Sequence, residues 1–190
     1  MNVVKQEIDG TRLLRLARES ITHHFGGPAP EIPDGDVYQQ KAATFVTVMR
    51  HGELHGCIGT LESHRTLADD VQHNAVAAAF FDPRSRPLLP GELGAISIEV
   101  SLLGPLEPLD VRTEADAIAK IRPFEDGVVL RNGRQRATFL PQVWEKLPDP
   151  REFLAQLKLK AGMPAFGWSP TMEVLRYSLL KWSENARPNT

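Results

Sequence analysis

The chain has 190 residues, of which 42% are apolar and 24% are charged, and its formal net charge at pH 7 is −2. This length and apolar content allow a buried core and exclude a disordered chain. The slight acidity argues against a protein that binds nucleic acid through a broad positive surface. Charged residues within the first ten positions and the lack of a long apolar run predict a cytoplasmic protein without membrane contact.

The first predicted element is an amphipathic helix over residues 10–25. Asp9 is a suitable N-cap, and Gly26-Gly27-Pro28 prevents the helix from continuing. The segment from Phe25 to Val37 is rich in Gly, Pro and Asp, which predicts an irregular connection before the first strand.

A β-hairpin is predicted next, from a β-branched run over 42–50, a turn at 51–53 and a returning strand over 54–62. The returning strand contains the only cysteine of the chain, Cys57, between Gly56 and Gly59. Glycine weakens a strand, so two glycines near a thiol indicate either unusual packing or a site. Strand alternation predicts two sets of side chains, one on each face: His55, Cys57 and Gly59, and Gly56, Ile58 and Thr60. The thiol and the imidazole are then expected to be neighbours.

The middle of the chain predicts a helix from a cap at Thr66 to Phe81, ended by Asp82-Pro83, and a half-buried strand over 96–102. A capping box at 113–116 predicts a short helix that ends before Pro123. The dipeptide Asn132-Gly133 between two apolar runs predicts a hairpin over 128–140 with a type I′ turn.

The C-terminal part predicts a short helix opened by Pro141, which carries Trp144, and a helix from the cap Asp149 to Ala161, where Gly162 follows. Residues 173–182 predict one long strand. Because strands and helices do not alternate strictly, the expected class is α+β, with a mostly antiparallel sheet and flanking helices.

Four segments together resemble the AMMECR family, whose prokaryotic members are called AmmeMemoRadiSam system protein A. They are Gly56–Thr60, Asp82-Pro83-Arg84, Ser101–Pro108 and Arg136–Trp144. Two positions depart from the family pattern: His55 stands where arginine is usual, and Ser85 where phenylalanine is usual. The resemblance covers nearly the whole chain but carries no established biochemical activity.

The resemblance implies a single AMMECR-like domain over 1–190, with a larger subdomain over 1–110 plus 171–190 and a smaller one over 111–170. It also implies a pathway with a Memo-like protein and a radical-SAM enzyme. A single cysteine cannot supply the usual ligand set of an iron–sulfur cluster, so the cluster is expected in the partner, and no cofactor is expected here.

The candidate catalytic residue is Cys57, because a thiol against exposed backbone amides beside an imidazole can act as a nucleophile. A buried, inert cysteine is the alternative. Asp82 and Arg84 form either a carboxylate–guanidinium pair facing a cleft or a structural ion pair. The candidate binding residues are His55, Gly56, Ile58, Gly59, Thr60, Asp82 and Arg84.

Other polar groups admit two interpretations. His55 and Cys57 with His51, His64 or His73 suggest a zinc site, but structural zinc usually shows two ligand pairs, so no metal is expected. The three arginines near the hairpin turn either hold a phosphate or line a solvated rim: Arg131, Arg134 and Arg136. Glu99 is a general base if its strand face lines a pocket.

Three functions follow from these patterns. The first is an accessory protein with a small-molecule or modified-residue site at 55–61. The second is a non-enzymatic interaction or scaffold module whose strand edge receives a partner's backbone. RNA binding is the third, and the acidity makes nucleic acid an unexpected partner. The sequence lacks the motifs of familiar enzyme classes, so it does not decide whether the protein is an enzyme.

Overall fold

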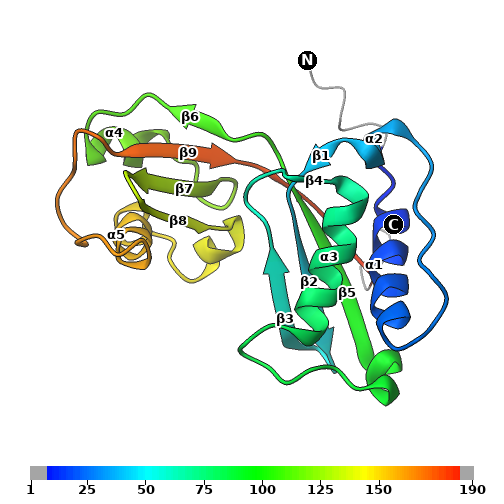
Figure 1. The fold of residues 1–190 in the computed structure, drawn as a ribbon. Helices are drawn as coiled ribbons and strands as arrows, with labels where there is room; N and C mark the ends of the chain where they lie inside the picture. The colour runs from blue at the N-terminus through cyan, green and yellow to red at the C-terminus, as the bar shows by residue number, and fades with distance from the viewer. Residues whose placement is uncertain (1–7, 185–190) are drawn as a thin grey trace, which may run out of the picture. The chain divides into compact units, whose positions relative to one another are not determined.

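The structure, a computed structural model that describes residues 8–184, divides into two units (Figure 1). Unit 1 contains the described residues up to Leu103 and from Leu180 onward, and unit 2 is Gly104–Leu179. The divisions lie near 103 and 180 and not at the expected 110 and 171, because β6 pairs with β9 inside unit 2. Both units combine helices with antiparallel sheets, which confirms the predicted α+β class.

Unit 1 contains three helices, one 3₁₀ helix and five complete strands in its described part, and β10 completes its larger sheet. The elements are α1 (Gly10–His24), α2 (Asp36–Gln39), β1 (Lys41–Ala42), β2 (Thr44–Arg50), β3 (Glu53–Gly59), β4 (Arg65–Thr66), α3 (Leu67–Phe80), η1 (Pro90–Ala95), β5 (Ile96–Leu103) and β10 (Leu179–Ser183). The larger sheet has the order β10-β5-β2-β3, so β3 is an edge strand. The short strands β1 and β4 form a separate ribbon.

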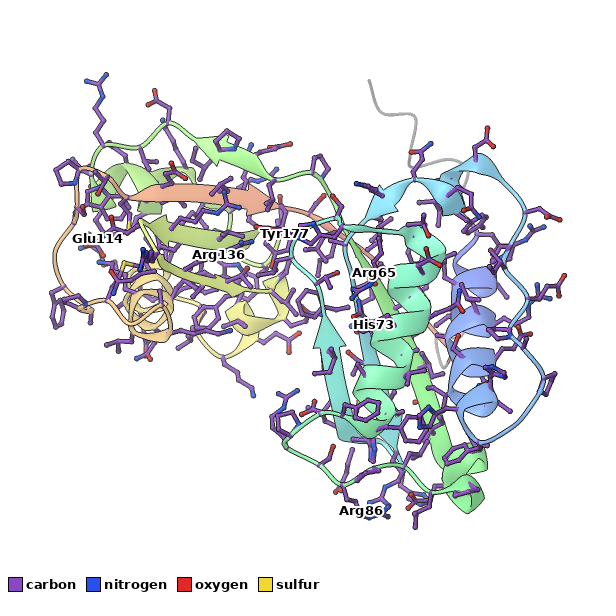
Figure 2. The ribbon with its side chains drawn as sticks, viewed as in Figure 1. Arg65, His73, Arg86, Glu114, Arg136 and Tyr177 are labelled. Carbon is purple, nitrogen blue, oxygen red and sulfur yellow. The ribbon has the colours of Figure 1, made fainter. Side chains whose placement is uncertain are left out.

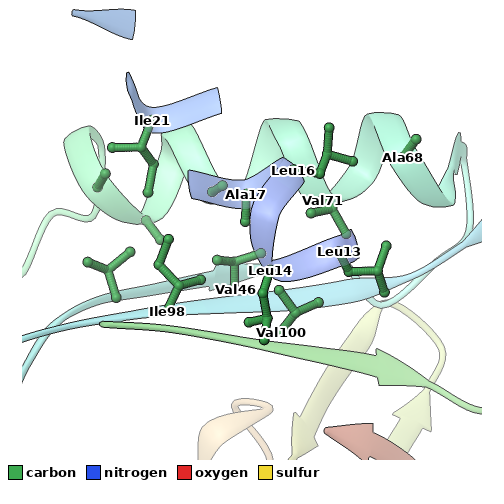
Figure 3. Close-up of a cluster of buried hydrophobic side chains, with 14 of the residues drawn as sticks. Leu13, Leu14, Leu16, Ala17, Ile21, Val46, Ala68, Val71, Ile98 and Val100 are labelled. Atoms are coloured by element: carbon green, nitrogen blue, oxygen red, sulfur yellow. The ribbon is translucent and has the colours of Figure 1, made fainter. Parts of the chain in front are cut away.

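The core of unit 1 lies between one face of the larger sheet and the helices α1 and α3 (Figure 3). Leu13 and Leu16 of α1 meet Val71 of α3 and Val46 and Ile98 of the sheet, all fully or almost fully buried. The predicted cap at Asp9 accepts the Thr11 amide hydrogen at 2.9 Å. The helical spacing of apolar residues therefore positions both helices on this face.

Unit 2 has a four-stranded sheet of order β6-β9-β7-β8 and helices that pack against one of its faces. Its elements are β6 (Glu107–Leu109), α4 (Glu114–Lys120), β7 (Gly127–Asn132), β8 (Gln135–Phe139), η2 (Pro141–Glu145), α5 (Pro150–Lys160) and β9 (Glu173–Tyr177). Trp144 and Phe153 stack at the centre of the core, with ring centroids 3.7 Å apart.

Two predictions about strands in this part of the chain are wrong. Residues 173–182 form two strands interrupted at Ser178, with β9 in the sheet of unit 2 and β10 in the larger sheet of unit 1. In the β7–β8 hairpin, Asn132 pairs with Gln135, so Gly133 is the first central residue of the turn, with φ +61°. Positive φ at this first position alone is typical of type II′, which requires glycine there, and not of type I′.

Within residues 8–184, none of the helices combines the length and the hydrophobicity that crossing a bilayer requires.

Candidate functional site

A β-bulge in β3 separates the two side chains that the sequence placed together. Opposite β2, Gly56 pairs with Val48, whereas the next pair is Leu54 with Met49, so His55 is an extra residue. The bulge interrupts the alternation of faces. The imidazole therefore lies under α3, 7% exposed, with its Nε2 atom 3.2 Å from the Ala79 carbonyl oxygen.

Cys57 lies on the other face of the sheet, away from α1 and α3. Its sulfur accepts a hydrogen bond from the Thr47 hydroxyl at 3.3 Å, and its side chain is half-buried. The expectation that thiol and imidazole are neighbours is therefore wrong. The zinc alternative required these two donors side by side, and among the described residues no group of three His, Cys, Asp or Glu side chains is placed to hold a metal ion.

The two glycines of the segment are explained by packing within the protein. A Cβ on Gly56 would lie 2.1 Å from the carbonyl oxygen of Ala78 in α3. A Cβ on Gly59 would lie 2.3 Å from the ring of Phe45, the residue opposite it on β2. Each glycine therefore allows a close approach of the protein's own atoms, which is one of the two interpretations that the sequence left open.

Asp82 and Arg84 hold the backbone of Cys57 at the open edge of β3. An Asp82 carboxylate oxygen accepts the Cys57 amide hydrogen at 2.9 Å, and the Arg84 guanidinium donates to the Cys57 carbonyl oxygen at 3.0 Å. The two side chains also pair with each other in a bidentate manner, at 2.9 and 2.6 Å. This arrangement satisfies both backbone groups that an edge strand would otherwise expose.

Asp82 is almost fully buried, and its pKa is lowered below its ordinary value. The largest cause is the hydrogen bond from Arg84, and the amide hydrogens of Cys57 and Arg84 act in the same direction. Ser85, which departs from the family pattern, donates to the carbonyl oxygen of His55. Side chains thus occupy the strand edge at 55 and 57, which contradicts the edge-pairing hypothesis for these residues.

Thr60, the last residue of the segment Gly56–Thr60, belongs to a buried hydrogen-bond network around Asp70 of α3. One carboxylate oxygen of Asp70 accepts hydrogen bonds from the Thr60 hydroxyl at 2.7 Å, from the Thr44 amide and hydroxyl, and from the Asn74 amide group. Arg65, labelled in Figure 2, approaches the other oxygen at 3.4 Å. This network fastens the end of β3 to α3.

Sequence reasoning missed Asp70 and Asn74, although a signal for them exists. They are four residues apart in α3 and share a helix face with the buried apolar residues Leu67, three positions before Asp70, and Ala78, four positions after Asn74. Polar residues at this spacing within a buried helix face must find internal partners. The two positions were therefore recognisable as a buried polar pair.

A row of polar side chains crosses the sheet face that carries Cys57. Thr47 pairs with Cys57 on β3 and with Glu99 on β5, so all three project from the same face. Lys181 of β10 forms an ion pair with Glu99 at 2.7 Å. We call these four residues the polar row: Cys57, Thr47, Glu99 and Lys181. A thiol, a hydroxyl, a carboxylate and an ammonium group thus come from four adjacent strands.

The remaining candidate, Ile58, points to the helix side and packs against the core of unit 1. The predicted residues are therefore divided among the two faces and the edge of β3. Of the catalytic and binding candidates Cys57 alone joins the polar row, where it is accompanied by Glu99, the residue that the sequence suggested as a general base.

Comparison with known proteins identifies relatives that match most of the chain. The AMMECR1 family model matches residues 14–182. A protein from Methanothermobacter thermautotrophicus is 40% identical over 160 residues, which cover 82% of this chain and 83% of that protein. Protein MK0488 from Methanopyrus kandleri is 37% identical over 173 residues, 87% of this chain and 84% of its own length.

The fold is also similar to a solved structure, the crystal structure of the uncharacterized protein PH0010 from Pyrococcus horikoshii. The TM-score is 0.81 at 30% sequence identity, and the match covers 91% of this chain and 90% of that one. The family resemblance carried by the four sequence segments is thereby confirmed over both units. The chain belongs to the AMMECR1 family.

Proposed function

We propose that this protein is an accessory component that acts with a Memo-like protein and a radical-SAM enzyme, and that the polar row is its site for a small ligand or a modified residue. The partners are those that the name of the family's prokaryotic members implies. The site follows from the side chains around Cys57. The two parts of the proposal are tested separately.

The observation that carries the site is the shared sheet face of the four side chains from Cys57 to Lys181. The Thr47 hydroxyl donates a hydrogen bond to the sulfur at 3.3 Å. Glu99 projects from the next strand of the row and forms an ion pair with Lys181 at 2.7 Å. A thiol, a hydrogen-bond donor and a carboxylate thus lie on adjacent strands of one partly exposed sheet face.

Asp82 and Arg84 act as positioning residues in this proposal. They do not belong to the polar row, but they fix the amide and the carbonyl of Cys57 and so limit the directions in which its thiol can point. A site on a strand whose backbone is held in this way is better ordered than a site on a free loop. The ligand is proposed to lie on the sheet face and not against the glycines, whose space is already filled.

The site is tested by alkylation of Cys57 with iodoacetamide in the native protein. We expect the wild-type protein to be labelled without unfolding, and the Thr47→Val variant to be labelled more slowly because the sulfur loses its donor. Ser97→Ala, a change on the same face of β5, is the matched control and should react like the wild type. Labelling that requires unfolding would make Cys57 a core residue and would end the proposal of a site.

The partnership is tested with purified proteins. We expect the Memo-like protein or the radical-SAM enzyme of the same organism to form a complex with the wild-type chain, measured by isothermal titration calorimetry. The absence of a complex with either protein would contradict this part alone, because it does not change the labelling of Cys57.

A further inference from the structure

The β7–β8 hairpin of unit 2 places two arginines directly opposite each other. Arg131 on β7 pairs with Arg136 on β8, so both side chains project from the same face of the sheet. The adjacent pair, Leu130 with Ala137, belongs to the core that the sheet shares with the helices. Because successive residues of a strand alternate between faces, the two arginine side chains project from the face away from that core.

The charged residues of this hairpin are all positive. Residues 127–139 contain three arginines and no acidic residue, and the third arginine is Arg134 in the exposed turn. Glu173 on β9 pairs with Arg131 from the other side, but its side chain is exposed. Like charges directly opposite each other on two strands destabilise a sheet. The opposed arginines therefore form a positively charged site whose cost to the sheet needs an explanation.

Arg131 has a donor that the described part of the protein does not use. Its Nε atom is buried, and no described residue accepts a hydrogen bond from it. Buried donors in proteins are nearly always satisfied, so this one needs a reason, and a bound ion is one of the reasons that proteins provide. A solvated rim, the other interpretation of these arginines from the sequence, does not account for a buried Nε atom.

The hydroxyl groups on the same face already have acceptors within the protein. Thr138 donates to the carbonyl oxygen of Val128 at 2.9 Å, and Tyr177 donates to the carbonyl oxygen of Phe139 at 3.2 Å. The two hydroxyl oxygens are also 3.0 Å apart. Figure 2 labels Tyr177 and Arg136 on this sheet. A ligand on this face therefore depends on the guanidinium groups and not on the hydroxyls.

We propose that Arg131 and Arg136 form a binding site for a phosphate group. The planar fork of arginine donates two parallel hydrogen bonds to phosphate oxygens. At pH 7 a phosphate monoester carries close to two negative charges, which match two opposed guanidinium groups better than the single charge of a carboxylate does. The anion removes the repulsion between the arginines and supplies an acceptor for Arg131. The polar row belongs to the sheet of unit 1, so this site does not rest on the proposed function.

The site is tested by isothermal titration calorimetry at pH 7, with the full chain and sodium chloride at constant ionic strength. The probes are inorganic phosphate and, in a second arm, glycerol phosphate. We expect the wild-type protein to bind at least one of them with a Kd of about 1 mM or lower. Tighter binding of the ester identifies a phosphorylated small molecule as the ligand class, and equal or weaker binding of the ester identifies the free ion. If neither probe binds saturably, the proposed site is wrong.

Three variants test which arginines bind the probe. Arg131→Met and Arg136→Met keep an apolar stem but remove the charged donors, and each should weaken binding by about tenfold or more. Arg134→Met removes the same charge from the exposed turn of the same hairpin and is the matched control, with an expected change below about threefold. Equal losses in all three variants would show a general attraction to positive charge and contradict the site. Acetate that binds as tightly as phosphate would contradict the ligand class.

Thermal unfolding distinguishes a binding site from a structural pair. Without phosphate, Arg131→Met should melt no lower than the wild type, because it loses both a repulsive contact and a buried donor without an acceptor. Phosphate at about ten times its Kd should raise the melting temperature of the wild type by about 3 °C and leave that of Arg131→Met unchanged. If Arg131→Met melts several degrees lower without phosphate, Arg131 stabilises the fold itself and the proposed site is wrong.

Discussion

Asp82 and Cys57 are 25 residues apart in the sequence and are joined by a hydrogen bond of 2.9 Å between a carboxylate oxygen and a backbone amide. Arg84 completes the contact by donating to the carbonyl oxygen of Cys57. These two side chains thus make the hydrogen bonds to the Cys57 backbone that a neighbouring strand would make if β3 were not at the sheet edge. The Asp-Pro-Arg segment and the Gly-Cys-Ile-Gly-Thr segment, which the sequence suggested as one site, are therefore one structural unit.

Replacing Asp82 should destabilise the protein considerably. Asp82→Ala leaves the Cys57 amide and the Arg84 guanidinium without their acceptor, and we expect a loss of about 3 kcal/mol, measured by urea unfolding at pH 7. Glu53→Ala, a change of an exposed carboxylate at the start of β3, should change stability by less than about 0.5 kcal/mol. Equal stabilities of Asp82→Ala and the wild type would show that the edge contact is not formed in solution.

The same carboxylate predicts a dependence of stability on pH. The pKa of Asp82 is lower in the folded protein than its unfolded value of about 3.9, so the folded state is favoured above that pH. As the pH falls through the unfolded value toward the folded one, this contribution is lost. We expect the gap in unfolding free energy between the wild type and Asp82→Asn to narrow below about pH 4. A gap that is constant with pH would contradict the lowered pKa.

Gly56 should tolerate no side chain. Because a Cβ at this position would lie 2.1 Å from the Ala78 backbone oxygen, Gly56→Ala must push α3 away from the sheet. We expect a loss of about 3 kcal/mol or more in unfolding free energy. Gly91→Ala is the matched control, since its Cβ would meet no atom within 4 Å, and its stability should be close to that of the wild type.

The sequence predicted most of the local structure because its signals were local. Caps at Asp9, Thr66 and Asp149 accept hydrogen bonds from the first turns of their helices, as the capping patterns indicated. The bulge at His55 was not predictable, because it depends on how β3 pairs with β2 and not on the composition of β3. One extra residue moved the imidazole to the other face and removed it from the neighbourhood of Cys57.

The candidate site was only partly predictable for a related reason. The resemblance pointed to Cys57, Asp82 and Arg84, and the structure brings these three together at the edge of β3. The polar row also contains Thr47 and Lys181. Thr47 belongs to β2, before the segment Gly56–Thr60, and Lys181 belongs to β10, far after it. Only the register of β2 with its two neighbours and the Glu99–Lys181 ion pair show that these side chains share one face. Glu99 was proposed from the sequence as a general base, but without the neighbours that the sheet register gives it.

The carboxylate of Asp70 should contribute more to the free energy of unfolding than the carboxylate of Asp69, its neighbour in the sequence. Asp70→Asn weakens an acceptor that serves four hydrogen bonds in a buried site, and we expect a loss of about 2 kcal/mol. Asp69→Asn changes an exposed residue of the same helical turn and should cost less than about 1 kcal/mol. Thermal unfolding of the two variants compares them directly, and equal losses would show that the network adds nothing beyond the charge at the helix start.

Lys158 should order residues 164–169 more than it stabilises the fold. This fully buried lysine donates to Glu114 at 2.8 Å and to the carbonyl oxygen of Gly167 at 3.1 Å. Replacing a buried ion pair by an apolar side chain of similar size is often nearly neutral, so we expect Lys158→Met to change the unfolding free energy by less than about 2 kcal/mol. Backbone amides of residues 164–169 should nevertheless exchange with deuterium faster, because the bond to the Gly167 carbonyl is lost. Lys160→Met, a change of the exposed lysine two residues later, should leave exchange in this segment unchanged. Unaltered exchange in Lys158→Met would mean that the other contacts of the segment hold it in place without the lysine.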